Sequence, residues 1–485
     1  MKNKKQKRAA IAARMVALIL AALMVLGVVA SLLPARAAIY NKDVLVRVGM
    51  FYNSNGVNTL TSHNVHTFEH GFEIGTLNEE TGEFTGIVSY PYKSVTVSCT
   101  YDNTSINFTS AEGKPLYSHI IAGTPICIRP LSLGDGERLY IGCASGKKFT
   151  GILEYKREIG KKMSMVNVLY LEDYIKGVLP NEIYPSWPAE SLKAAAVTAR
   201  SFVLFQIGGK HTGDDFDVCC KTHCQVFSGN GNGYATTDAA VDATRGQILT
   251  YDGAVAMTPY HVSSGGATES AAGCWGGSES RYPYLCGVET PREEYESYPN
   301  GTWSVSLTPQ EITDFINSKA DYKGKLSGTV TKIECVKGNT GYVRQISFYD
   351  AQGNSITITN SNSVKNFLSK YVKSANFTVS TYCEAIVDGK ETYIDTQSIS
   401  VMTSSGVKTI SAFPHELSAL SSEGKKLFTE SKDIVYTIDG KGYGHGVGLS
   451  QYGSMTLAQR GHDYRYILGL YFPGTLLEPV SSIYG

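Results

Sequence analysis

The first 33 residues constrain the fate of the whole chain, because a basic stretch there precedes a long uncharged apolar run. Six Lys and Arg residues lie between Lys2 and Arg14, and the apolar run from Met15 to Leu33 follows them. This order is typical of an export signal. The run is long enough to span a bilayer, and the small residues of Ala35-Arg36-Ala37 suit a signal peptidase. A cleaved signal peptide and a membrane anchor over residues 1–38 both remain open.

The export signal and the charge of the remaining chain limit where the protein works and what it binds. We expect everything after residue 38 to be extracytoplasmic, either membrane-anchored or secreted. Residues 1–37 contain seven Lys and Arg and no acid, so the formal net charge of zero becomes minus seven for the exported part. Nucleic acid and other polyanions are therefore not expected as partners.

Ten cysteines in an exported chain raise the question of disulfides. Seven of them are scattered along the sequence without the regular spacing of a disulfide framework. Only Cys219, Cys220 and Cys224 lie close together. This group is the one part of the cysteine pattern that points to a local site.

The pattern of apolar residues predicts a mixed α+β fold. Runs such as Val44–Phe51, separated by Gly and Asn turns, predict a small β-rich domain over residues 39–147. Residues 148–480 predict a second domain of mixed strands and helices, with a Ser/Thr-rich insertion at about 384–433. Its clearest helix begins at Pro188 and ends before Gly208-Gly209. The apolar residues of this helix recur at helical spacing.

A carboxylate lies in a conformationally restricted segment just before that helix. Leu171 to Val178 predict another helix, and the sequence PNEIYP (180–185) follows it. Proline restricts its own backbone and that of the preceding residue. We therefore expect Glu182 in a short loop that holds its side chain in place.

Common hydrolase and nucleotide-binding motifs are missing from the sequence. It contains no GxSxG, no HExxH and no Walker loop. Glycine occupies every second position from 440 to 448, which lets another backbone or a sugar approach closely. His445 emerges from this stretch. A sugar-contacting His445 and a structural His445 in a tightly packed strand are equally compatible with the pattern.

Three sequence signatures lie between residues 150 and 480. The first signature reads LEDYIKGVLPNE (171–182) and WPAESLKAAAVTAR (187–200). The second reads YHVSSGGATE (260–269), and the third reads GYGHGVGLSQYG (442–453). With these signatures in this order, the chain resembles the stage II sporulation protein D (SpoIID)/LytB family over residues 150 to 480. Agreement in three parts is far more specific than one short motif.

The resemblance implies a SpoIID-like catalytic domain, with a long packed helix and a substrate groove, acting on peptidoglycan at the cell wall. The expected activity is that of a lytic transglycosylase, which cleaves the MurNAc-GlcNAc bond of peptide-free glycan strands during engulfment in spore formers. The glutamate after Pro-Asn is the family's catalytic acid, here Glu182. Such an enzyme needs one carboxylic acid, whereas ordinary glycosidases need two. The muramic 6-hydroxyl attacks its own anomeric carbon, which gives a 1,6-anhydro-MurNAc product.

The resemblance also implies a zinc site in the stretch DVCCKTHCQVF (217–227). Cys219 and His223 are the expected ligands, with Cys220 as an alternative thiolate. Thiolate and imidazole are good zinc ligands, and a site with few protein ligands keeps positions open. A disulfide between Cys224 and Cys219 or Cys220 is the competing interpretation for an exported protein.

Polar residues of the second and third signatures are candidates for contact with sugar hydroxyl or N-acetyl groups. They are Ser263, Ser264, Thr268, Glu269, His445, Ser450, Gln451 and Tyr452. A structural role is the alternative for each of them. Arg200 is expected to pair with a buried acid and so to hold the long helix in place.

A second function of another class is also compatible with the resemblance. The family includes LytB-type amidase enhancers, which bind the wall and activate an N-acetylmuramoyl-L-alanine amidase without cleaving glycan themselves. In that case a cell-wall amidase and other engulfment proteins would be the expected partners. The β-rich residues 39–147 favour this interpretation somewhat, because they extend beyond the recognised domain and could bind wall polymer or a partner.

Overall fold

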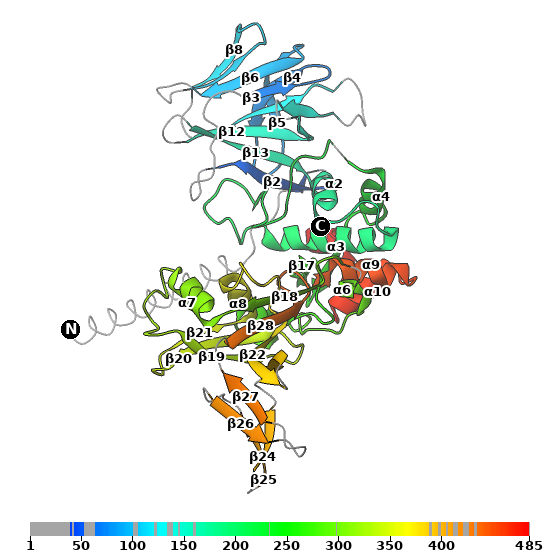
Figure 1. Cartoon of the computed structure of the whole chain (residues 1–485). Coiled ribbons are helices and arrows are strands. Elements are labelled where there is room, and N and C mark those ends of the chain that lie inside the picture. Colours follow the sequence, from blue (N-terminus) through cyan, green and yellow to red (C-terminus); the bar gives the residue numbers. More distant parts are fainter. Residues whose placement is uncertain are drawn as a thin grey trace, which may run out of the picture. The chain divides into compact units, whose positions relative to one another are not determined.

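Figure 1 presents a computed structural model of the chain. It describes residues 39–484 except 41–42, 53–63, 100–104, 121–123, 133–138, 144–145, 159–161, 232, 297, 388–389, 396–398, 404–405, 411–415, 421–425 and 431–433. The expected leader at 1–38 lies outside the described residues, as do the side chains of 383–433. No helix within the described part of the chain is long and apolar enough to cross a membrane. The chain forms two compact units, which are described separately below.

The first unit comprises residues 1–186, 199–256 and 477–485 and contains two large β-sheets. The eight-stranded sheet has the order β1-β2-β13-β12-β9-β4-β5, with β14 beside β2. Its strands are β1 (Ile39–Tyr40), β2 (Asp43–Phe51), β4 (Phe72–Leu77), β5 (Phe84–Tyr90), β9 (Ile126–Pro130), β12 (Ile152–Glu158), β13 (Lys162–Tyr170) and β14 (Val218–Cys219). The six-stranded sheet has the order β11-β10-β3-β6-β7-β8. Its strands are β3 (Asn64–Thr67), β6 (Ser94–Cys99), β7 (Ile106–Thr109), β8 (Pro115–His119), β10 (Ile141–Cys143) and β11 (Lys148–Phe149).

Alternating side chains explain why these segments are strands. In β2, Val44, Val46 and Val48 point to the interior and are at most 3% exposed. The two sheets meet through a buried hydrogen bond between His66 on β3 and Tyr155 on β12. The eight-stranded sheet continues past residue 147, where the sequence analysis places a domain boundary, because β12 and β13 lie in its centre (Figure 1).

Helices and a small sheet complete the first unit. These elements are α2 (Leu171–Glu182), α3 (Ala189–Gln206), α4 (Ala235–Ala243), α11 (Ser481–Tyr484), β15 (Gln247–Tyr251), β16 (Ala254–Val255) and β30 (Leu476–Pro479). Helix α2 contacts β2, β13 and α4. The residues of α3 from Ala199 onward belong to this unit, and those up to Thr198 belong to the second.

Two expectations about helix ends were wrong. Pro180-Asn181-Glu182 is not part of a loop but forms the last turn of α2. Proline has no N–H to donate in this turn, and the Asn181 side chain adds a hydrogen bond from Nδ2 to the Gly177 carbonyl at 2.7 Å. Pro188 is not the first residue of α3, since the helix begins at Ala189. Its carbonyl instead accepts the first helical bonds, from the N–H groups of Ser191 and Leu192.

The second unit comprises residues 187–198 and 257–476. One of its sheets has the order β18-β28-β22-β27-β26, with β23 beside β22, and another has the order β19-β20-β21. The strands are β17 (Tyr260–His261), β18 (Thr302–Leu307), β19 (Val330–Lys337), β20 (Val343–Asp350), β21 (Ser355–Thr359), β22 (Phe377–Val387), β23 (Lys390–Asp395), β24 (Ile399–Thr403), β25 (Gly406–Ile410), β26 (Glu416–Leu420), β27 (Lys426–Glu430), β28 (Ile434–Lys441) and β29 (Leu449–Ser450). The helices are α5 (Ala271–Trp275), η2 (Glu279–Arg281), α6 (Glu293–Glu296), α7 (Pro309–Asn317), α8 (Ser361–Phe367), α9 (Gln451–Gln459) and α10 (Tyr464–Tyr471).

Local sequence signals explain the helices that cover these sheets. A capping box between Thr308 and Glu311 starts α7, and its buried Phe315 and Ile316 pack into the core. The stretch at 384–433, expected as an insertion, contains the antiparallel pairs β24-β25 and β26-β27. With several sheets and helices in both units, the predicted mixed α+β class is confirmed.

Candidate active site and metal cluster

Glu182 is the last residue of α2, and its carboxyl group is held in place. Its side chain is half-buried, and Oε1 accepts a hydrogen bond from the backbone N–H of Val226 at 2.8 Å. A backbone N–H that donates to a carboxylate favours its ionised form. The contact therefore orients the group and supports it in the state that accepts a proton.

A small polar cavity of about 180 Å³ lies in the first unit and is lined by Pro180 and Asn181, the two residues before Glu182. It is lined by Lys148, Lys176, Pro180, Asn181, Ser228, Gly229, Asn230, Gly231, Gly233 and Tyr234. Ser228 donates from Oγ to Oδ1 of Asn181 at 3.4 Å, so the two segments that form the cavity are connected. Backbone, hydroxyl and amide groups predominate, as expected for a site that binds hydroxylated ligands.

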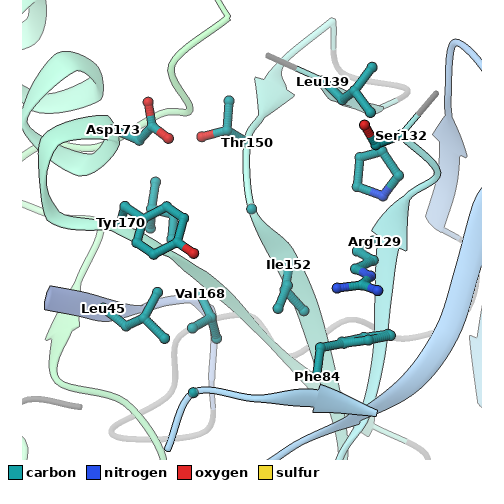
Figure 2. A pocket seen from close by; sticks show the side chains of 14 residues that line it. Leu45, Phe84, Arg129, Ser132, Leu139, Thr150, Ile152, Val168, Tyr170 and Asp173 are labelled. Atoms are coloured by element: carbon teal, nitrogen blue, oxygen red, sulfur yellow. The ribbon is translucent and has the colours of Figure 1, made fainter. Parts of the chain in front are cut away.

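A larger cavity of about 370 Å³ opens at the other end of α2. Figure 2 shows Tyr170 and Asp173 on one side of it and Arg129 with Phe84 on the other. Arg129 lies over the Phe84 ring and pairs with Glu73 at 2.7 Å. Nine residues of helix separate Asp173 from Glu182, or roughly 14 Å along the axis. This cavity is therefore separate from the carboxyl group.

Four potential metal ligands gather immediately before Val226. They are His211, Cys219, His223 and Cys224, and one donor atom from each lies within 4.8 Å of all the others. Nε2 of His211 lies 3.3 Å from the Cys224 sulfur, and Nδ1 of His223 lies 3.5 Å from it. Two imidazoles and two thiols are a donor set that fits tetrahedral zinc.

The local fold explains why these ligands meet. Cys219 lies on β14, which pairs in parallel with β2, while His211 follows the end of α3 and packs against Phe216. The Cys224 thiol donates a hydrogen bond to Cys219 and lowers the pKa of Cys219 to about 3, although burial alone would raise this pKa. The same bond, together with burial, raises the pKa of Cys224. Cys219 is thus poised as the thiolate of the group.

The structure brings together the two expected ligands, Cys219 and His223, but not Cys220. The Cys220 thiol donates instead to the Met50 carbonyl at 3.7 Å. Cys219, Cys220 and Cys224 are free thiols rather than disulfide partners. The sequence analysis missed His211 and the ligand role of Cys224. The sequence did contain a signal for His211, because this residue lies within fourteen residues of the group formed by Cys219, His223 and Cys224.

The second and third signatures come together in the second unit. Ser263 and Tyr443 form a β-bridge, and β17 pairs with β29 in parallel. Ser263 and Ser264 are fully buried around the carboxyl group of Glu294. That group accepts hydrogen bonds at Oε1 from the N–H groups of Ser264 and Gly265, at 2.7 and 2.9 Å. Burial raises the pKa of Glu294. The sequence analysis did not identify this residue.

Three further predicted substrate contacts are also buried. Glu269 is fully buried and pairs with Arg344 at 2.8 Å. Thr268 accepts from the Val288 N–H, and Ser450 caps α9 by accepting from Gly453. A sugar at the protein surface does not reach these side chains in this conformation. They stabilise the signatures from inside, and their predicted contact with substrate stays a prediction.

The remaining predicted contacts, His445, Gln451 and Tyr452, are half-buried. Nδ1 of His445 accepts from the Val447 N–H at 3.1 Å, and its ring lies 5.6 Å from that of Trp275. Burial lowers the pKa of His445 to about 4, so the ring is neutral near pH 7. A neutral imidazole beside an indole suits contact with an uncharged sugar better than with an anion.

Tyr452 belongs to a row of four aromatic side chains in the second unit, which we call the aromatic row. Its ring lies 4.8 Å from that of Trp187 and 4.5 Å from that of Tyr298. Tyr443 continues the row at 6.3 Å from Tyr298 and is 42% exposed. Exposed aromatic rings provide apolar faces with polar edges, as sugar rings require. The sequence analysis identified only Tyr452 of this row.

Comparison with known proteins agrees with the family that the signatures resemble. Residues 159–251 match the sequence profile of SpoIID, described as "Stage II sporulation protein". The amidase enhancer of Bacillus subtilis (strain 168) is 30% identical over 315 residues, which are 62% of this chain and 40% of that protein. This chain therefore spans two fifths of the length of that relative.

Two other relatives match over larger parts of their length. An uncharacterized protein of Brachyspira hyodysenteriae is 30% identical over 313 residues, which are 64% of this chain and 67% of that protein. Stage II sporulation protein D of Bacillus amyloliquefaciens is 23% identical over 333 residues, which are 64% of this chain and 75% of that protein. This chain belongs to the SpoIID/LytB family.

Proposed function

We propose that this chain is an extracytoplasmic lytic transglycosylase that cleaves the MurNAc-GlcNAc bond of peptide-free glycan strands. Family membership gives it a role connected with sporulation or the cell wall. The position of Glu182 is the observation that carries the finer proposal. It ends the first part of the first signature, the Val226 N–H fixes its carboxyl group, and the preceding residues Pro180 and Asn181 line a polar cavity.

One carboxyl group suffices for this reaction. Glu182 donates its proton to the glycosidic oxygen while the bond from that oxygen to the anomeric carbon breaks. The 6-hydroxyl oxygen of the same muramic residue bonds to the anomeric carbon, and its proton returns to Glu182. No water is consumed. The Val226 N–H supports the ionised form of Glu182 between the two proton transfers.

The cluster of His211, Cys219, His223 and Cys224 is the proposed zinc site. Zinc held there would add a structural cross-link and some positive charge near Val226. Val226 follows Cys224 by two residues and donates to Glu182, so the cluster fixes the backbone that orients the acid. The proposed role of the site is to position this backbone.

In this proposal the aromatic row binds sugar rings of the same strands. The rings of the aromatic row follow one another at 4.5 to 6.3 Å and come from three segments, which contain Trp187, Tyr298, and Tyr443 with Tyr452. Such a row can contact successive sugars without depending on charge. That property suits a substrate with a uniform, repeating backbone.

The test is digestion of peptide-free glycan strands, followed by mass spectrometry of the soluble sugars. The wild type should release products ending in 1,6-anhydro-MurNAc. The Glu182→Gln variant should release about 10²- to 10⁴-fold less, which is the usual contribution of general acid–base catalysis. The amide oxygen of the introduced glutamine can still accept from the Val226 N–H, so the fold should persist. Glu80→Gln, at an exposed position, is the matched control. No products from a folded, zinc-loaded wild type would reject the proposal.

An amidase-enhancer function is the second candidate. It is favoured by the 30% identity with a relative named for that function, although this chain spans 40% of it. In this case adding the protein to an N-acetylmuramoyl-L-alanine amidase should speed release of stem peptides, and Glu182→Gln should do so equally well. Loss of this effect in Glu182→Gln would instead connect the stimulation to glycan cleavage.

A further inference from the structure

A basic cavity of about 390 Å³ lies in the second unit, and residues 265–267 of the second signature form part of its lining. It is lined by Gly265, Gly266, Ala267, Arg292, Tyr295, Lys337, Thr340, Gly341, Asn376, Phe377, Thr378, Asp439 and Lys441. Its volume lies in the usual range for small-ligand sites, which is about 300–1,000 Å³. The cavity is thus large enough for a sugar with its substituents.

Positive charge predominates in this cavity. Arg292, Lys337 and Lys441 line it together with one acid, Asp439. Among the described residues, the ion pairs of this unit involve neither Lys337 nor Lys441. Burial lowers the pKa of Lys337, and the nearby charge of Lys441 lowers it further. The positive charges of Lys337 and Lys441 repel each other, and a bound anion would relieve this repulsion.

Several contacts hold the backbone of the cavity wall in place. The backbone N–H of Lys441 donates to the Asn376 carbonyl at 3.0 Å, and its ammonium lies 5.4 Å from the centre of the Tyr295 ring. The Gly265 N–H donates to the buried carboxylate of Glu294. The charged side chains of Arg292, Lys337 and Lys441 are exposed and can reach a ligand from this backbone.

Glycine at 265 and 266 keeps the cavity open. Both residues have positive φ, at 72° and 103°. A side chain at Gly265 would collide with the backbone of Lys441 at 2.8 Å. The second signature therefore forms part of a cavity wall, although its serines are buried.

We propose that this cavity binds the free lactyl carboxylate of a peptide-free muramic residue, with Lys337 and Lys441 as its charged partners. The lactyl carboxyl of a muramic residue carries the stem peptide through an amide bond, so only an amidase product has the free anion. The cavity would thus let the protein distinguish stripped strands from peptide-bearing ones. This inference rests on the proposed glycan substrate but not on cleavage by Glu182.

The other lining residues favour a sugar acid over a phosphate polymer. Tyr295 and Phe377 add apolar rings, while Thr340 and Thr378 supply hydroxyl groups. Asp439 can accept a hydrogen bond from a sugar hydroxyl or an acetamido N–H, which a glycerol phosphate polymer offers less often along its chain than a GlcNAc-MurNAc strand. A sugar ring that carries one carboxylate therefore has partners for the lysines, for Asp439 and for the aromatic rings of this lining.

The test is a binding titration with the Glu182→Gln protein, so that no ligand is cleaved. One ligand is a peptide-free GlcNAc-MurNAc tetrasaccharide, and the other is the same tetrasaccharide with its lactyl carboxyls converted to methyl amides. We expect the acid to bind about tenfold more tightly at low salt, because lysine–carboxylate bonds are charge-assisted. Adding Lys337→Gln and Lys441→Gln should remove this preference. Lys323→Gln, an exposed lysine of the same unit, should keep it.

Three results would overturn the inference. They are equal binding of acid and amide, an unchanged preference in the double lysine variant, and tighter binding of poly(glycerol phosphate) that displaces the sugar acid. Failure of cleavage by the wild type would leave the titration readable, since it requires no catalysis. The proposed function and this inference can therefore fail separately.

Discussion

Arg200 and Glu172 form a buried ion pair that joins α3 to α2. Nε and Nη2 of Arg200 donate to the two carboxylate oxygens at 2.9 and 2.8 Å, and Nη1 donates to the Gln247 carbonyl at 2.9 Å. Arg200 is 0% exposed. The pair therefore connects the helix that ends at Glu182 with the interior of the first unit, as the sequence analysis expected of Arg200.

Glu172→Gln should destabilise the first unit strongly, because it leaves the Arg200 charge buried without its counter-ion. Removing one partner of a buried pair costs about 3–5 kcal/mol. Urea unfolding followed by circular dichroism measures this loss. Lys193→Gln, which breaks the partly exposed pair with Glu190, is the control and should cost about 0–1 kcal/mol. Equal effects of the two substitutions would contradict the structural role of Arg200.

Zinc retention should depend on Cys224 but not on Cys220. The Cys224 sulfur lies among the other three donors, whereas the Cys220 thiol points to the Met50 carbonyl. Metal analysis of purified Cys224→Ser should give far less zinc per chain than the wild type, and Cys220→Ser should match the wild type. Zinc loss in Cys220→Ser alone would mean that the ligand set is wrong.

The free energy of unfolding should decrease in acid, partly through His66. Burial lowers the pKa of His66 to about 4, so the folded state binds fewer protons than the unfolded state below about pH 6.5. The contribution of His66 is complete above pH 6.5 and is lost as the pH falls toward 4. Between pH 4 and 6.5 the free energy of unfolding of His66→Gln should therefore change with pH less steeply than that of the wild type, by about 1.4 kcal/mol per pH unit.

Parallel curves for the wild type and His66→Gln would contradict this assignment. His261 and His445 do not obscure the comparison. Burial lowers the pKa of both residues, and both contribute equally to the two curves. Urea titrations at several pH values between 4 and 7 give the required free energies.

Binding of glycan by the aromatic row should weaken when its central ring is removed. Tyr298 lies between Tyr452 and Tyr443, so Tyr298→Ala interrupts the row. We expect a three- to tenfold weaker affinity for peptide-free strands, which corresponds to about 0.5–1.5 kcal/mol. Tyr466→Ala is the control, because Tyr466 is 51% exposed and stacks on His462 outside the row. Equal affinities of the two variants would exclude the row from binding.

Local signals in the sequence predicted the long helix α3 well. Its apolar residues recur at helical spacing, and Leu192 and Ala196 on the predicted apolar face are at most 1% exposed. The end of α2 was harder to predict. Pro180 suggested a loop, but the helix continues through it to Glu182, and Nδ2 of Asn181 adds a hydrogen bond to the Gly177 carbonyl.

Features that depend on distant pairing were not readable from the sequence. β13 pairs with β2 across more than a hundred residues, so the sheet crosses the boundary expected at 147. His211 becomes a candidate ligand only because the end of α3 meets β14. Ser263 and Ser264 resembled substrate contacts, but Glu294, which lies thirty residues away, binds them in the interior.

The most direct test of the central claim, that Glu182 drives an intramolecular cleavage, is digestion of peptide-free glycan in ¹⁸O-labelled water with mass analysis of the released sugars. We predict anhydro products without ¹⁸O from the wild type and almost none from Glu182→Gln, because the 6-hydroxyl attacks in place of water. Reducing-end products carrying ¹⁸O, or undiminished release by Glu182→Gln, would contradict the claim.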